Sequence, residues 1–395
     1  MNTVLAKFAL TVGSSDKGRK TIAWILAAVL SPLILITAVL CSLASGGAEH
    51  NNTTVKACFY GPNYTEKVPN EFKTHVSEMR EAFSLLDSAI ASANSSEDST
   101  GSLDPTMVKA VFFALCFGED APTVRAAGQF VDCFYSEQEL TREVESEDEN
   151  GETVTETETY TAITPLSLES AYTNLSAELG REISDEDKDN IRHIYTMIAG
   201  PMGVENYTGT YEVGGQRSVE IDLSTFSDPS TKNAHDLTAY AINAWQSGWG
   251  YVWGTYGQIM TEKLFASKLQ QYPEGVGNYA DFIQANWVGG RTADCVGLIK
   301  GYGWLDAETL ELRYGTNGMP DVGANQMYYN ATVSGTIDTI PDTPGLAVWH
   351  DGHIGVYIGN GEVIEAMGTK YGVVKTQLEG RGWTHWLQVP YISYD

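Results

Sequence analysis

The sequence is poor in cysteine, histidine and basic residues. Its 395 residues include 5 cysteines, 7 histidines and 24 lysines and arginines, against 51 aspartates and glutamates, which gives a formal charge of −27. So few cysteines argue against a disulfide-built scaffold. The acidic balance repels polyanions, so we expect no nucleic-acid partner. Spacings typical of zinc sites, calcium loops and phosphate-binding loops are missing, and we expect no metal or cofactor.

Long apolar runs are also scarce, with one exception near the N-terminus. Residues 22–43 carry no charge, and about 22 helical residues span roughly 33 Å, which is enough to cross a bilayer. Basic residues precede this run, and none follows until Lys56. The positive-inside rule therefore predicts a cytoplasmic tail over 1–21, a single-pass anchor over 22–44 and an exported remainder. A cleaved signal peptide is the alternative, although its apolar core is usually shorter.

Residues 55–205 are predicted to form a mostly helical domain of unknown role. Apolar residues recur at alternating steps of four and three over residues 72–90, which indicates an amphipathic helix capped by Asn70. Cys116 and Cys133 fall in helical segments, where they either form a disulfide or are buried separately. Capping residues and helix-stopping glycines indicate further helices over 105–117, 122–135, 166–179 and 185–199.

An acidic stretch, residues 137–158, interrupts these helices. Alternating residues flank Asn150-Gly151, and this dipeptide between alternating strands is a strong signal for a β-hairpin. The density of charge predicts a solvent-facing ribbon. Glycine, proline, serine and threonine become frequent after Pro201, so we expect a linker over 206–232.

The last part of the chain, residues 233–395, is predicted to be α+β. Helices are expected after Asn233 and from Cys295 onward. Three short apolar runs follow Pro344, separated by Asp-Gly and Asn-Gly turns, and this pattern is typical of antiparallel strands. Helices that come first and strands that come later in the same domain define an α+β arrangement.

Cys295 is the last cysteine of the chain, and it directly follows Asp294 at the predicted start of a helix. A thiolate is a strong nucleophile, but an ordinary cysteine is mostly protonated at neutral pH. Backbone N–H groups at a helix N-terminus and a neighbouring imidazole both favour the anion. We therefore expect the pKa of Cys295 to be lowered.

His353 opens an apolar strand, which places its ring on a rigid element. A two-residue turn at Asn360-Gly361 would pair Val356 with Glu365 on the next strand. The Glu365 carboxylate is then expected to accept from the imidazole Nδ1–H and to orient the ring. Cys295, His353 and Glu365 would together form a catalytic triad with a thiol as nucleophile.

Four segments resemble the NlpC-type family of papain-like cysteine peptidases, which cut bacterial cell-wall peptides: "YVWG", "DCVGL", "PGLAVWHDGHIGVYIGNGEVIEA" and "GVVKTQLEGRGWTHW". The resemblance covers almost the whole C-terminal part. It implies a papain-like fold, with Cys295 as nucleophile, His353 as general base and acid, and Glu365 as the third residue. By position, it also makes Tyr251 and Asp294 candidates for substrate binding.

The chain departs from this family at three places. Glu365 stands where the family more often has His, Asn or Gln, which keeps the acceptor and adds a charge. Val296 stands where a serine is common, which puts recognition of the amino end of the substrate in doubt. Residues 255–293 replace a usually short loop, and we expect them to form a helix and loop over the cleft, as a lid or specificity wall.

We therefore expect a membrane-anchored peptidoglycan hydrolase on the outer side of a bacterial cell membrane. Its predicted substrate is the stem peptide, cut after D-glutamate through an acyl-enzyme on Cys295. One alternative is an amidase that cuts between muramic acid and L-alanine, because Cys–His–Glu sets serve that reaction in a related family. The other is an inactive wall-binding or assembly protein. The layout also resembles wall hydrolases of bacterial conjugation elements, so a conjugation or cell-envelope assembly is a candidate partner.

Overall fold

A computed structural model describes much of the chain after the predicted anchor, which itself lies outside the described residues. Within them, no helix is both long enough and apolar enough to span a bilayer. The chain divides into two compact units, Met1–Ala57 and Cys58–Asp395, and the elements below belong to the second. The described ranges are 52–62, 69–95, 101–117, 127–147 and 153–394.

The first helices of this unit follow their sequence signals closely. In α3 (Asn70–Asn94), the apolar stripe is buried, as predicted, but Pro69 occupies the cap position and no side chain caps the helix. Asp104 caps α4 (Pro105–Cys116) by accepting the backbone N–H groups of Thr106 and Met107. These contacts satisfy two donors that the helix leaves open.

Two more helices end in glycine-containing turns. The α6 helix (Leu168–Leu179) begins two residues later than predicted, because Pro165 still belongs to a strand, and it ends at Gly180 in the left-handed conformation. The α7 helix (Asp185–Ala199) has the predicted bounds and begins with a capping box of Ser184 and Asp187. The segment after Gly200 leaves this helix in a new direction.

The helix predicted over 122–135 is shorter in the structure. Residues 118–126 lie outside the described part, α5 covers Ala127–Asp132, and Tyr135 already begins strand β1 (Tyr135–Glu147). This strand pairs antiparallel with β2 (Thr153–Pro165) along its full length, from Tyr135 opposite Pro165 onward. Continued strand pairing therefore replaces the last turn of the expected helix. Cys116 and Cys133 are both buried and are not joined by a disulfide.

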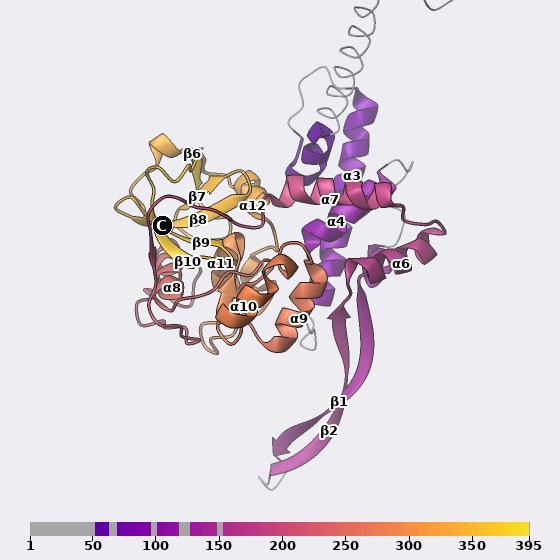
Figure 1. Cartoon of the computed structure of the whole chain (residues 1–395), viewed down its shortest axis with the longest axis horizontal. Helices are drawn as coiled ribbons and strands as arrows, with labels where there is room; N and C mark the ends of the chain where they lie inside the picture. Colours follow the sequence, from indigo (N-terminus) through magenta and orange to yellow (C-terminus); the bar gives the residue numbers. More distant parts are fainter. Residues whose placement is uncertain (1–51, 63–68, 96–100, 118–126, 148–152, 395) are drawn as a thin grey trace, which may run out of the picture. The chain divides into compact units, whose positions relative to one another are not determined.

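The C-terminal part is built on an antiparallel sheet whose strands do not lie in the order of the chain. With its helices, this sheet makes the chain α+β (Figure 1). Helices α8 (Ala234–Gln246) and α11 (Cys295–Trp304) pack against β8 and β9 at the sheet centre. The strand order is β3-β10-β9-β8-β7-β11-β6, with bounds β3 Tyr211–Val213, β6 Ser334–Thr336, β7 Ala347–His350, β8 His353–Gly359, β9 Glu362–Gly368, β10 Gly372–Gln377 and β11 His385–Leu387. Strand β3 comes from the segment predicted as a linker, and it pairs with β10.

Residues 255–293 form a compact insertion with its own secondary structure. Its elements are β4 (Tyr256–Ile259), α9 (Glu262–Gln271), α10 (Ala280–Asn286) and β5 (Arg291–Ala293), and β4 pairs with β5. The Gln271 side-chain amide donates to the carbonyl of Ser102 at 2.6 Å, so α9 contacts the loop that directly precedes α4.

The pairing of β8 with β9 differs from the prediction by one residue. The turn at Asn360-Gly361 sets Gly359 opposite Glu362, as expected, but Ile358 is an extra residue and the next pairs are Tyr357 with Val363 and Val356 with Ile364. The predicted pairing of Val356 with Glu365 is therefore wrong. Side chains alternate between sheet faces, so this bulge moves Glu365 from the face of Val356 to the face of His353.

Candidate active site

Asp294 joins the start of α11 to the turn at Gly254. One carboxylate oxygen accepts the backbone N–H of Gly297 at 2.6 Å, and the other accepts that of Gly254 at 2.8 Å. Burial raises the pKa of this carboxyl, although the charge of Lys300 and these two bonds oppose the rise. Both oxygens are thus engaged in holding the backbone that presents Cys295.

Cys295 is the first residue of α11, and its sulfur lies beside the start of β8. The backbone N–H groups of Ile354 and Val296 lie near enough to the thiol to lower its pKa. Ile354 directly follows His353, so the fold brings the predicted nucleophile against the strand that bears the predicted base.

The electrostatic setting of Cys295 differs from the prediction. Burial and then the charge of Asp294 raise its pKa to about 12, and the two backbone donors do not offset this rise. The expectation of a lowered pKa is therefore wrong. A helix terminus stabilises an anion only within a short distance, whereas loss of water penalises it from all sides, and Cys295 is only 3% exposed.

His353 is hydrogen-bonded to Glu365, which lies on the neighbouring strand. The distance from His353 Nε2 to Glu365 Oε2 is 2.7 Å, and the two side chains are 3% and 0% exposed. The structure uses Nε2 for this contact, where Nδ1 had been expected. Nδ1 is the ring nitrogen that this bond leaves free of Glu365.

Glu365 has two further partners that the sequence did not single out. Arg381 donates from Nε to Oε1 at 2.8 Å and from Nη2 to Oε2 at 2.6 Å, and the Thr376 hydroxyl donates to Oε1 at 2.7 Å. Burial alone would raise the pKa of Glu365, but the hydrogen bonds and charges of His353 and Arg381 lower it to about 2. Arg381 lies in the "LEGRGW" segment of the resemblance, and an arginine between two glycines was the available signal.

Aromatic and imidazole rings cover His353. The Trp383 ring stacks on it with centroids 5.4 Å apart and planes 9° apart. The ring of His350 lies 5.4 Å from His353 and 5.3 Å from Trp383. Burial and the nearby charge of His353 lower the pKa of His350. This stack shields the bond between His353 and Glu365 from water.

Tyr251 is fully buried next to the thiol. No described residue hydrogen-bonds its hydroxyl. Burial, followed by the charge of the Cys295 thiolate, raises the pKa of Tyr251 well above its ordinary value, which places the two side chains close together. A Cβ on Gly203 would lie 3.1 Å from this hydroxyl, so the backbone of Gly203 lies against the Tyr251 ring.

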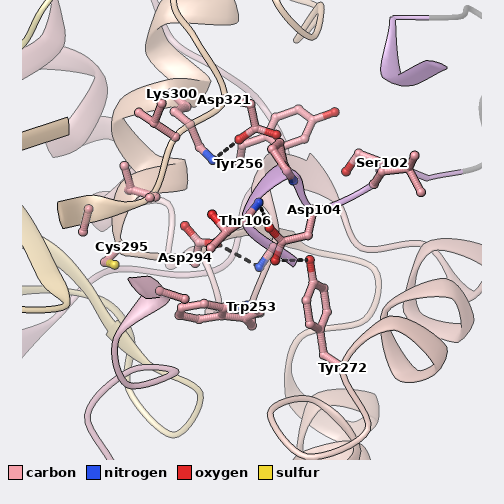
Figure 2. Close-up of a pocket in the computed structure, with 18 of the residues that line it drawn as sticks. Ser102, Asp104, Thr106, Trp253, Tyr256, Tyr272, Asp294, Cys295, Lys300 and Asp321 are labelled. Atoms are coloured by element: carbon pink, nitrogen blue, oxygen red, sulfur yellow. Dashed lines mark hydrogen bonds and ion pairs between the residues drawn. The ribbon is translucent and has the colours of Figure 1, made fainter. Parts of the chain in front are cut away.

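A small cavity lies next to Cys295, and residues 102–106 of the predicted helical domain form part of its wall (Figure 2). Asp104 accepts the hydroxyls of Tyr195 at 2.8 Å and of Tyr272 at 3.2 Å, and the Trp253 indole N–H donates to Tyr195 at 2.8 Å. The cavity volume is about 60 Å³.

A second, larger cavity of about 360 Å³ adjoins this wall. Tyr195 and Tyr272 line both cavities, so the two tyrosines bound to Asp104 separate them. Apolar side chains dominate its lining, including Met107, Tyr172, Ile191, Met202 and Leu269.

The backbone segment 200–204, which we call the covering segment, lies across the ends of β8 and β9. A Cβ on Gly200 would lie 2.3 Å from the Cα of Gly352, which immediately precedes His353. A Cβ on Gly203 would lie 2.9 Å from the Cα of Gly368, the last residue of β9. The Val204 N–H donates to the carbonyl of Met367 at 2.8 Å. Glycines on both sides permit this close backbone approach.

The structure therefore buries all four of these side chains: Cys295 lies near Tyr251 and the backbone of Ile354, and His353 is bonded to Glu365. Asp294 holds the backbone at the start of α11. Comparisons with family models, with curated proteins and with solved structures found no match to this chain. Across the described ranges, no group of three or more His, Cys, Asp or Glu side chains is arranged to hold a metal ion.

Proposed function

We propose that the chain is a membrane-anchored peptidoglycan hydrolase whose C-terminal part is a papain-like cysteine peptidase of the NlpC type. The observation that supports this most is the junction of α11 with β8. There the Cys295 thiol lies near the backbone N–H of Ile354, the residue after His353, while His353 is bonded to a buried carboxylate. A thiol, a base and an orienting acceptor in series are the parts that acyl transfer requires.

In the proposed reaction, His353 Nδ1 takes the thiol proton while the sulfur attacks the amide carbonyl carbon. The amide C–N bond then breaks, and the same proton passes from His353 to the departing amine nitrogen. A thioester remains on Cys295. His353 next takes a proton from water, the hydroxide oxygen attacks the thioester, and the carboxylic acid product leaves as the thiol regains its proton.

The raised pKa of Cys295 bears on how this reaction begins. The raised pKa keeps the thiol protonated in the free protein, so the proposed first step moves its proton to His353. Glu365 stabilises the imidazolium that forms, as its bond to Nε2 strengthens when the ring becomes charged.

The proposed substrate is the peptidoglycan stem peptide, with the amide bond after D-glutamate as the favoured site. Digestion of purified sacculi by the full chain tests this. Wild type should release peptide fragments, Cys295→Ala should release none, and Cys133→Ala, which changes another buried cysteine far from the site in sequence, should behave as wild type. An unchanged fragment profile in Cys295→Ala would remove the proposal.

A related amidase is the second candidate, and the carboxylate partner of His353 favours it, since Cys–His–Glu sets serve that chemistry. Mass spectrometry of the same digest separates the two reactions. An amidase frees an intact stem peptide that begins with L-alanine. An endopeptidase leaves part of the stem peptide attached to the glycan.

An inactive wall-binding or assembly protein is the third candidate, and the burial of Cys295 favours it. A thiol that is only 3% exposed and has a raised pKa is typical of a structural cysteine. Alkylation with iodoacetamide at neutral pH tests this candidate: a Cys295 that reacts faster than Cys58, which is also buried with a raised pKa, would contradict it. Fragment release from sacculi decides the hydrolase proposal.

A further inference from the structure

The contacts of Glu365 extend the proposed site by one residue. The carboxylate is fully buried, and its two oxygens accept from His353, from Thr376, and from Nε and Nη2 of Arg381. A buried carboxylate without a cation nearby is strongly destabilising, and an arginine fork matches a carboxylate with two parallel bonds. Arg381 is therefore the group that permits a charged residue at this position.

Arg381 is itself held in one orientation. Its guanidinium lies 5.0 Å from the centroid of the Tyr207 ring and 5.1 Å from that of the Trp383 ring. Trp383 also stacks on His353, so one ring contacts both the cation and the imidazole. Cation–π contacts of this kind are strongest where water is excluded, and the Arg381 side chain is only 6% exposed.

We propose that Arg381 is a positioning residue of the peptidase site, which holds Glu365 in place for His353 and offsets its negative charge. This inference rests on the proposed function. Glu365 together with Arg381 presents His353 with a hydrogen-bond acceptor in a nearly neutral unit. Such a unit resembles, in charge, the Asn or Gln that the resembled family often has at the third position.

The consequence is a specific dependence on pH. His350 on β7 and Glu365 on β9 contact His353 directly. Arg381 in the β10–β11 loop acts on it through Glu365, and Cys295 on α11 lies near the backbone of the next residue, Ile354. Removing the Arg381 charge leaves the Glu365 charge uncompensated, which favours the imidazolium. A higher pH is then needed to obtain the free base, so the acid limb of the rate profile moves to higher pH.

The test compares the full chain with Arg381→Met, Arg381→Lys and the double variant Glu365→Gln/Arg381→Met. Two readouts are followed against pH: the rate of Cys295 alkylation by iodoacetamide, and kcat/KM for fragment release from sacculi. Arg381→Met should move the acid limb of both profiles up by about one pH unit. Arg381→Lys keeps the charge, so its limb should stay in place while kcat falls roughly tenfold from the lost fork geometry.

The double variant removes both charges, so its acid limb should return to the position of the parent. If the acid limbs of the Arg381→Met and parent profiles coincide, the proposal is overturned. An arginine with a merely structural role would change the size of the rate without moving its acid limb along the pH axis. If Arg381→Met does not fold, Arg381→Gln keeps a donor and removes only the charge, with the same expected shift. If the chain is no hydrolase, the parent releases no fragments and the alkylation profiles alone decide the role of Arg381.

Discussion

Acid should destabilise the fold through Glu365 in a measurable way. The carboxyl has an ordinary pKa of 4.5, which the folded environment lowers to about 2. Because the folded pKa is depressed, the stabilisation is present above pH 4.5 and is lost as the pH falls toward 2, where the unfolded chain binds a proton that the folded chain does not. A change of about 2.5 pKa units at 1.36 kcal/mol each gives about 3 kcal/mol in full.

The other acidic residues of this chain also titrate in that range, so a difference measurement is required. The parent is compared with Glu365→Gln/Arg381→Met, which lacks the carboxyl and leaves no unpaired arginine. Urea unfolding followed by tryptophan fluorescence gives the free energy of unfolding at about pH 5 and about pH 3, and the parent should lose about 2 kcal/mol more than the double variant over that interval. Equal losses in the two proteins would refute the assignment of a depressed pKa to Glu365.

Two further predictions concern backbone positions around the site. Gly355→Ala places a Cβ 2.8 Å from Val363 Cγ1 and should lower the free energy of unfolding by about 1–3 kcal/mol. In the control Gly128→Ala, the Cβ meets nothing within 4 Å, so the free energy of unfolding should be nearly unchanged. Thermal unfolding checks both variants. Val204→Pro removes the donor of a 2.8 Å backbone bond in the covering segment, so Cys295 should be alkylated roughly fivefold faster, while Val204→Ala keeps the donor and the wild-type rate. Equal alkylation rates in the two variants would contradict a role of this segment in covering the thiol.

Much of the local architecture could be read from short stretches of sequence. Asp104 before Pro105 predicted a capped helix, and the cap bonds are present. Ser184 and Gly200 predicted the bounds of α7. Capping and turn formation depend on residues within one helical turn of each other, so neighbours in the sequence suffice to predict them.

The candidate site was less accessible from the sequence. The residue types at Cys295, His353 and Glu365 were predicted, but one bulged residue, Ile358, decides whether Glu365 faces His353. A one-residue change of register turns every later side chain to the other face, and no local pattern signals it. Arg381 was missed for a similar reason, because a loop carries it back to a strand sixteen positions earlier in the chain.

The sequence by itself determined the α+β order, the caps of α4 and α7, the turn at Asn360-Gly361 and a cysteine at the start of a helix. Only the tertiary structure decided that this cysteine is buried, lines a cavity that Asp104 also lines, and has a raised pKa. The physical reason is the distance along the chain over which each effect acts. Backbone hydrogen bonding and periodicity act over a few residues, whereas desolvation and charge pairing depend on which distant segments exclude water from the same place.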